Sequence, residues 1–67
     1  MAKVMSVEDA GRPEGKRRYV CTLDDGSVEN FEFYDDELTF TTTELVGLTW
    51  NEVWDLFRKR DIAYLQS

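Results

Sequence analysis

Carboxylates are the side chains in this sequence with the most evident chemical potential, and several of them stand in two short runs. Asp35-Asp36-Glu37 offers the oxygen ligands that Mg²⁺ and Ca²⁺ prefer. However, adjacent acids on one strand point to opposite faces, so these three carboxylates do not converge on a single ion. The run therefore favours a solvated turn over a metal site.

The second run is Asp24-Asp25-Gly26-Ser27, which has the composition of part of a calcium-binding loop. It lacks the alternating ligands and the distal Glu that such a loop requires. An Asp that opens a turn and a Gly in the positive-φ position are typical of a hairpin connection. We therefore expect a turn here, and no metal ion at either run.

Residues for catalysis are scarce. The chain has no His to act as a general base, no Ser or Cys in a nucleophile motif, and no Gly-rich loop that would cradle phosphate. The single cysteine, Cys21, cannot form an internal disulfide, and one Cys without His excludes a structural zinc site. Because Cys21 alternates with Tyr19 and Leu23, we expect it to be a small buried hydrophobe. We expect neither an enzyme nor a bound cofactor.

The charge pattern favours a protein partner over nucleic acid. The net charge is −6, and between Arg18 and Arg58 there are ten acids and no Lys or Arg, while 16–18 and 58–60 are basic. Binding to phosphates depends on cations, whereas an acidic body suits a partner with a basic surface, or solubility alone. The richness in aromatic residues also leaves open that the chain binds a second copy of itself. The candidate partner-binding residues are Asp24, Asp25, Glu29, Glu32, Asp35, Asp36, Glu37, Trp50 and Trp54.

Two alternative functions involve nucleic acid. An acidic inhibitor would occupy a basic site as a partial mimic. Duplex DNA carries one charge per ~1.7 Å, so a strand of ~26 Å needs about 15 charges to match it, and the ten central acids fall short of full mimicry. A truncated helix-turn-helix would use 44–49 as the turn before a recognition helix. Glu52 and Asp55 then stand where DNA-contacting residues are needed, which disfavours direct DNA binding.

Length and composition predict one small folded domain, 1–67. Apolar residues make up 42% of the chain and aromatic residues 13%, far more than an acidic disordered segment carries. The first six residues contain no apolar stretch long enough for a secretory signal, and no window approaches the ~20 apolar residues of a membrane span. We therefore expect a cytoplasmic domain that does not enter a membrane.

Strand signals concentrate in 16–41, which we expect to form a β-hairpin or a three-stranded meander. The segments 19–23 and 28–34 are rich in β-formers and flank the Gly26 turn. A three-residue loop with Gly26 in a bulge is favoured over a two-residue loop, because it gathers the apolar residues on one face. That face would carry Tyr19, Cys21, Leu23, Phe31 and Phe33.

Two further segments carry weaker strand signals. After a turn at 35–36, the segment 37–41 is expected to be a third strand, with Leu38 and Phe40 on one side. The conformation of 1–15 is left open, with part of it expected to be flexible. Within it 3–7 fits a short strand, 6–9 fits a helical turn, and 11–15 is a loop.

The segment 42–66 is expected to form a short helical turn and then the main amphipathic helix. Thr41 to Glu44 and Thr49 to Glu52 both fit the capping box, and Gly47 fits the end of the first turn. In the main helix a core-facing arc of roughly 120° would contain Trp50, Val53, Trp54, Phe57, Tyr64 and Leu65.

Asp61 also lies in that arc. It either pairs with a cation, namely Arg58 or one of 16–18, or marks the end of the helix near Arg60. We favour a continuous helix, because no Gly or Pro marks a stop. Trp50 and Trp54 fit the core better than a binding hot spot, although Trp and Tyr are typical of both.

The segments 38–49 and 59–67 resemble the C-terminal part of small proteins encoded by phages and prophages. The resemblance spans less than half of the chain and carries no signature motif, so it assigns no functional residue. It implies an accessory protein that acts in the host cytoplasm by binding a host or virion protein. The function expected from the sequence is thus a small, acidic, non-catalytic protein–protein interaction module of α+β class, with the hairpin or meander packed against a C-terminal amphipathic helix.

Overall fold

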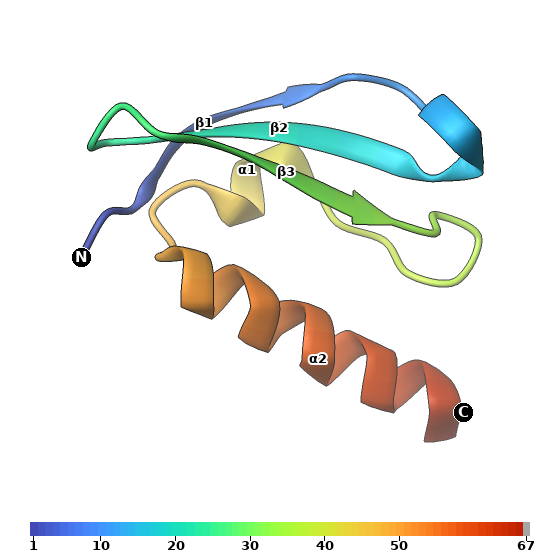
Figure 1. Ribbon diagram of the computed structural model, residues 1–67. Helices are drawn as coiled ribbons and strands as arrows, with labels where there is room; N and C mark the ends of the chain where they lie inside the picture. The colour runs from blue at the N-terminus through green and yellow to red at the C-terminus, as the bar shows by residue number, and fades with distance from the viewer. Residues whose placement is uncertain (67) are drawn as a thin grey trace.

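The structure, a computed structural model, describes residues 1–66 as one antiparallel sheet and two helices. The elements in chain order are β1 (Val4–Asp9), a 3-10 turn (Pro13–Gly15), β2 (Arg17–Leu23), β3 (Val28–Phe33), α1 (Thr42–Leu45) and α2 (Trp50–Gln66). The strand order is β1-β2-β3, and α2 runs beneath one face of the sheet (Figure 1). The predicted α+β class, with a three-stranded meander and a C-terminal helix, is confirmed.

The β2–β3 hairpin has the predicted three-residue loop. The Leu23 N–H donates to the Ser27 C=O at 2.8 Å, and the Gly26 N–H donates to the Leu23 C=O at 3.0 Å. Gly26 has a φ of 90°, which is the left-handed conformation that a bulge of this type requires. The resulting register buries the predicted face of the sheet, made of Tyr19, Cys21, Leu23, Phe31 and Phe33.

The third strand is not the predicted one. The segment 37–41 contains no strand, because the Tyr34 C=O accepts the N–H groups of Glu37 and Leu38 and turns the chain directly after β3. The third strand is instead β1, in the N-terminal region whose conformation the sequence left open. Leu38 and Phe40 are nevertheless buried, so the loop delivers its apolar side chains to the core without pairing.

The N-terminal strand is held by the segment between the helices. The Val4 N–H donates to the Leu48 C=O at 2.7 Å, and the Gly47 N–H donates to the Val4 C=O at 2.8 Å. The Val4 side chain is buried in the same core as β2 and β3. Backbone pairing and apolar burial together fix β1 against the end of α1.

Both predicted capping boxes form. The Thr41 hydroxyl accepts the Glu44 N–H at the start of α1, and the Glu44 carboxylate accepts the Thr41 N–H. At the start of α2 the Glu52 N–H donates to the Thr49 hydroxyl at 3.2 Å, and the Thr49 N–H donates to the Glu52 carboxylate at 2.9 Å. Each box satisfies two backbone donors that a helix start otherwise leaves unpaired.

Helix α2 is continuous through Asp61, as favoured from the sequence, but its apolar arc is only partly in the core. Val53 is fully buried, and Phe57 is half-buried. Tyr64 and Leu65, which were expected in the arc, are 44% and 72% exposed. The last turns of this 17-residue helix therefore carry apolar side chains that lie largely in solvent.

Phe31 joins the sheet to α2. Its ring centroid lies 5.2 Å from Trp54, 5.9 Å from Phe57 and 6.3 Å from Trp50, all in edge-to-face geometry. Edge-to-face pairs add stabilisation beyond the area that they bury. Cys21 lies in the same core, and its burial raises the pKa of the thiol to about 11, in line with the structural role expected for it.

Candidate partner-binding surface

The two acids of the hairpin turn support the turn itself. The Asp25 carboxylate accepts both the N–H and the hydroxyl of Ser27, at 2.9 and 2.6 Å, and these bonds lower the pKa of Asp25. The Asp24 carboxylate accepts the Lys3 N–H at 3.1 Å. Both side chains remain exposed, but each already has a role in shaping the turn.

Two of the other predicted acids pair with arginines at the start of β2 and in the loop before it. Asp35 contacts Arg12 at 3.2 Å and Arg17 at 3.1 Å, and Glu32 contacts Arg18 at 2.7 Å. In the sequence, Arg17 and Arg18 belong to the basic segment 16–18, far from both acids. The hairpin register brings Arg18 opposite Glu32 and Arg17 opposite Phe33, next to the turn with Asp35.

The predicted acids do not form one continuous surface. Asp24 and Asp25 lie at one end of the hairpin, and 35–37 lie at the other, as Figure 1 shows for the two connections that flank β3. The six residues of β3 separate the two ends by about 20 Å. Glu29 and Glu32 lie on opposite faces of the sheet, because Glu29 pairs with Cys21 and Glu32 with Arg18.

Ion pairing neutralises the arginines and leaves most of the acids unpaired. Each of the five arginines forms an ion pair, through Asp9, Glu32, Asp35, Glu44 or Asp55. Fourteen acids minus these five leaves nine that form no ion pair within residues 1–66. The nine are Glu8, Glu14, Asp24, Asp25, Glu29, Asp36, Glu37, Glu52 and Asp61. The surface therefore presents acids, with the guanidinium groups already neutralised.

The two tryptophans lie at the margin of the core. Trp50 is half-buried and Trp54 is 37% exposed, while the centroids of the two rings are 6.1 Å apart. Because both rings also contact Phe31, they anchor α2 to the sheet and still offer part of their surface to solvent. Ile62, which the helical arc did not include, is also exposed on α2.

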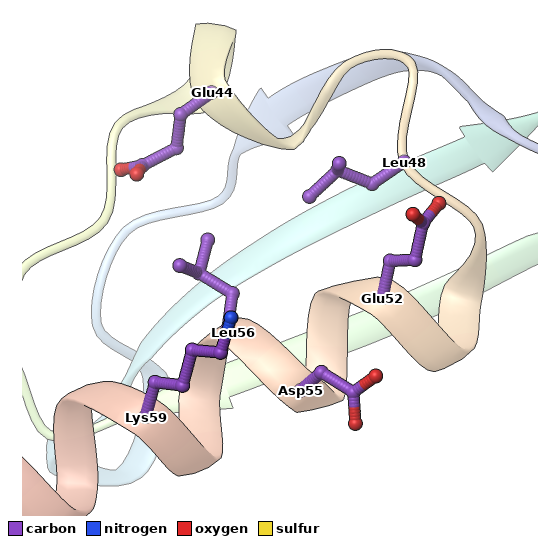
Figure 2. Close-up of a pocket in the computed structure, with 6 residues that line it drawn as sticks. All are labelled: Glu44, Leu48, Glu52, Asp55, Leu56 and Lys59. Atoms are coloured by element: carbon purple, nitrogen blue, oxygen red, sulfur yellow. The ribbon is translucent and has the colours of Figure 1, made fainter.

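A hollow of about 420 Å³ lies between α2 and the segment that includes α1. Figure 2 shows Leu48 and Leu56 pointing into it, with Glu44 on the α1 side and Glu52, Asp55 and Lys59 along α2.

The carboxylates of this hollow are already engaged. Glu44 accepts hydrogen bonds from Arg60, which are the main cause of the lowered pKa of Glu44. The Thr49 N–H is the main cause of the lowered pKa of Glu52, and Asp55 pairs with Arg58. The carboxylates around this hollow therefore stabilise the helices, and they do not make it a favourable ligand-binding site.

A second hollow, of about 280 Å³, lies where β3 ends. Its apolar wall is Phe33, Leu38 and Phe57, and its other lining residues are Lys16, Glu32, Tyr34, Glu37 and Asp61. The Lys16 ammonium lies 4.9 Å from the centre of the Tyr34 ring, so this cation is held to one side.

Asp61 has none of the cation partners considered for it from the sequence. No ion pair joins it to Arg58 or to 16–18 among the described residues, and its half-buried carboxylate lines the second hollow. Glu37 on the same hollow is also without an ion pair in 1–66. No pattern in the sequence predicts this arrangement, since its residues come from four separate segments.

Within residues 1–66 no three acids or cysteines stand close enough to hold a metal ion. No described helix combines the length and apolarity needed to cross a membrane. Comparison with protein-family models, curated proteins and solved structures found no match to this chain.

Proposed function

We propose that this chain is a small, acidic, non-catalytic interaction module that binds another protein through a basic surface of that partner. The observation that carries the proposal is the pairing of all five arginines, against nine acids in the described chain that form no ion pair. Complementary charge raises the rate of encounter and selects among partners. The resemblance to phage accessory proteins extends the proposal to a host or virion protein as partner.

An inhibitor of a nucleic-acid-binding protein is the second candidate. The ion pairs of the arginines favour it as well, because they leave no unpaired guanidinium within residues 1–66 to repel a basic groove. The separation of the acids at the two ends of the hairpin favours contact with two patches of such a groove over continuous mimicry of a duplex. Direct DNA binding is disfavoured, since Glu52 and Asp55 are exposed at the start of α2.

The proposal is tested by capturing a partner from a host lysate on the immobilised chain and measuring its affinity at increasing salt. We expect the affinity to fall steeply with salt, because exposed charges are screened over about 10 Å at 0.1 M ionic strength. Glu29→Lys and Glu37→Lys should each weaken binding severalfold. Glu8→Lys is the matched control, since Glu8 is also exposed and unpaired but lies in β1.

Three outcomes separate the candidates. Competition by duplex DNA for the captured partner would favour the inhibitor. Retention that is indifferent to salt and to both charge reversals would exclude the acidic surface as the binding site. A chain that retains no partner under low-salt conditions would contradict the interaction module itself.

A further inference from the structure

Strand β3 has an open edge. The Leu23 N–H to Ser27 C=O bond fixes which residues of the hairpin exchange hydrogen bonds, and in an antiparallel pair these alternate with residues that do not. In the observed register the backbone groups of Glu29, Phe31 and Phe33 turn towards β2. Those of Val28, Asn30 and Glu32 turn to the outer edge of the sheet, where residues 1–66 provide no hydrogen-bond partner for them.

The edge of the sheet at β1 is partly covered, in contrast to the open edge at β3. At β1 the segment 47–49 exchanges backbone bonds with Val4 and pairs with Lys3. At β3 the open groups span about 17 Å, enough for a strand of five residues. Unpaired edges attract added strands, and small proteins usually protect them with charge, proline or a covering loop.

The surroundings of this edge are acidic and lead into the second hollow. Glu29 is exposed on the inner face of β3, and Glu32 lies on the outer face. The hollow at the end of β3 holds Glu37 and Asp61 above an aromatic wall. Its volume of about 280 Å³ is below that of a usual small-molecule site but suits one long side chain.

We propose that the β3 edge binds an extended, basic segment of the partner, which adds to the sheet as a fourth strand. This inference rests on the proposed function and specifies its partner chemistry. Backbone groups of Val28, Asn30 and Glu32 bind the added strand, and a Lys or Arg side chain enters the hollow with its stem on Phe57 and its charge near Asp61. The half-exposed Trp54 offers a ring face to a second cation.

A second copy of the chain is the competing occupant, and charge disfavours it. Each copy carries a net charge of −6. Pairing of two β3 edges would bring the unpaired Glu29 of each copy into one sheet, while Arg18 of each copy is already paired with Glu32. A basic strand instead offers a cation to Glu29 as it adds, so both the backbone groups and the unpaired charge are satisfied.

The test uses a synthetic eight-residue peptide that alternates Lys and Val, titrated into the whole chain and followed by amide NMR. We expect the amides of Val28, Asn30 and Glu32 to shift and to exchange more slowly with solvent, while those of Glu29 and Phe31 keep their protection. Two control peptides isolate the contributions. One alternates Glu and Val; the other alternates Lys and Pro, so it keeps the charge and lacks half of the backbone donors.

Two variants test the edge without changing the acids. Asn30→Pro removes an outward N–H and blocks strand addition, at a position where an edge strand accepts proline because that N–H does not pair with β2. Asn30→Ala keeps the backbone donor and is the matched control. We expect the proline variant to bind the Lys-Val peptide at least tenfold more weakly, and the alanine variant to bind it within about twofold of the parent chain.

The outcomes distinguish this inference from the proposed function. Equal binding of the Lys-Val and Lys-Pro peptides, equal affinity of a folded Asn30→Pro chain, or shifts confined to other elements would each overturn strand addition. A partner captured equally well by the proline variant would overturn it too, but would leave the interaction module standing. Self-association of the parent chain through Val28, Asn30 and Glu32 at neutral pH would make a second copy the occupant instead.

Discussion

Glu44 makes polar contacts with both ends of the helical half. Its carboxylate accepts the Thr41 N–H in the first capping box and hydrogen bonds from the Arg60 guanidinium, 16 residues further along the chain. The Arg60 Cζ atom lies 4.8 Å from the centre of the Phe40 ring, so the same arginine also covers the core. One side chain therefore ties α1 to α2.

The pKa of Glu44 is lowered, chiefly by Arg60, so the ionised form stabilises the fold. Its contribution is complete above the unfolded pKa of about 4.3 and is lost as the pH falls through the lower, folded value. Glu44→Gln should cost about 1–2 kcal/mol at pH 7, since Gln retains the cap but not the charged pair. This difference should shrink as the pH falls below about 4, as measured by urea unfolding at several pH values.

Glu52→Gln is the control for this prediction. Glu52 makes the equivalent capping contacts with Thr49 and has no arginine partner in the described chain. Its substitution should cost less than that of Glu44. Equal losses for the two variants at pH 7 would show that the Arg60 pair contributes nothing beyond the cap.

Contacts between residues close in sequence could be predicted, and contacts between residues distant in sequence could not. The Thr41 and Thr49 caps depend on a spacing of three residues, which the sequence displays directly. The pairing of Arg18 with Glu32, or of Arg60 with Glu44, depends on the register of the sheet and the path of α2. The basic character of 16–18 is evident in the sequence, whereas its ion pairs and the resulting excess of unpaired acids are evident only in the fold.

Among the elements, α2 combines a buried first half with an apolar C-terminal end that is largely exposed. Val53 is fully buried beneath the sheet, whereas Ile62 and Leu65 are 48% and 72% exposed. Periodicity identifies an apolar face but not how far the opposing surface extends, which explains why Tyr64 and Leu65 were expected in the core.

The effect of a substitution in α2 on the free energy of unfolding should therefore depend on its position in the helix more than on the residue type. Val53→Ala should cost about 1–3 kcal/mol because it leaves a cavity. Leu65→Lys should change the free energy of unfolding by no more than about 0.5 kcal/mol, because the side chain is already in water. Urea unfolding followed by tryptophan fluorescence measures both. A loss from Leu65→Lys as large as that from Val53→Ala would mean that the last turns are packed.

The identity of the third strand could not be predicted from local sequence either. The segment 37–41 has the composition of a strand, but the turn that begins at Tyr34 carries it away from the β3 edge. The N-terminal strand pairs with the opposite edge of β2, where Val7 faces Cys21 and Glu8 faces Val20. Local propensity left open a hairpin or a three-stranded meander, and the turn at Tyr34 excludes 37–41 as the third strand.

For the whole molecule, net charge and edge exposure act against each other. Residues 1–66 leave the β3 edge unpaired, with Val28 56% exposed beside it, a combination that promotes edge-to-edge association. A net charge of −6 on a chain of 67 residues opposes contact between copies at neutral pH. Under the proposed function, the same acids would attract a basic partner while their repulsion opposes contact between copies.

This balance predicts that the free chain is a monomer at pH 7 and associates near its isoelectric point of about 4.4, where the repulsion between copies disappears. Sedimentation velocity at the two pH values measures the change, and far-UV circular dichroism at the same pH values checks that the fold persists. Asn30→Pro should suppress the association and Asn30→Ala should not, because only proline removes an edge donor. Association that is identical in the two variants would assign it to the exposed turns of α2 instead, while a dimer at pH 7 in low salt would show that charge does not protect the edge.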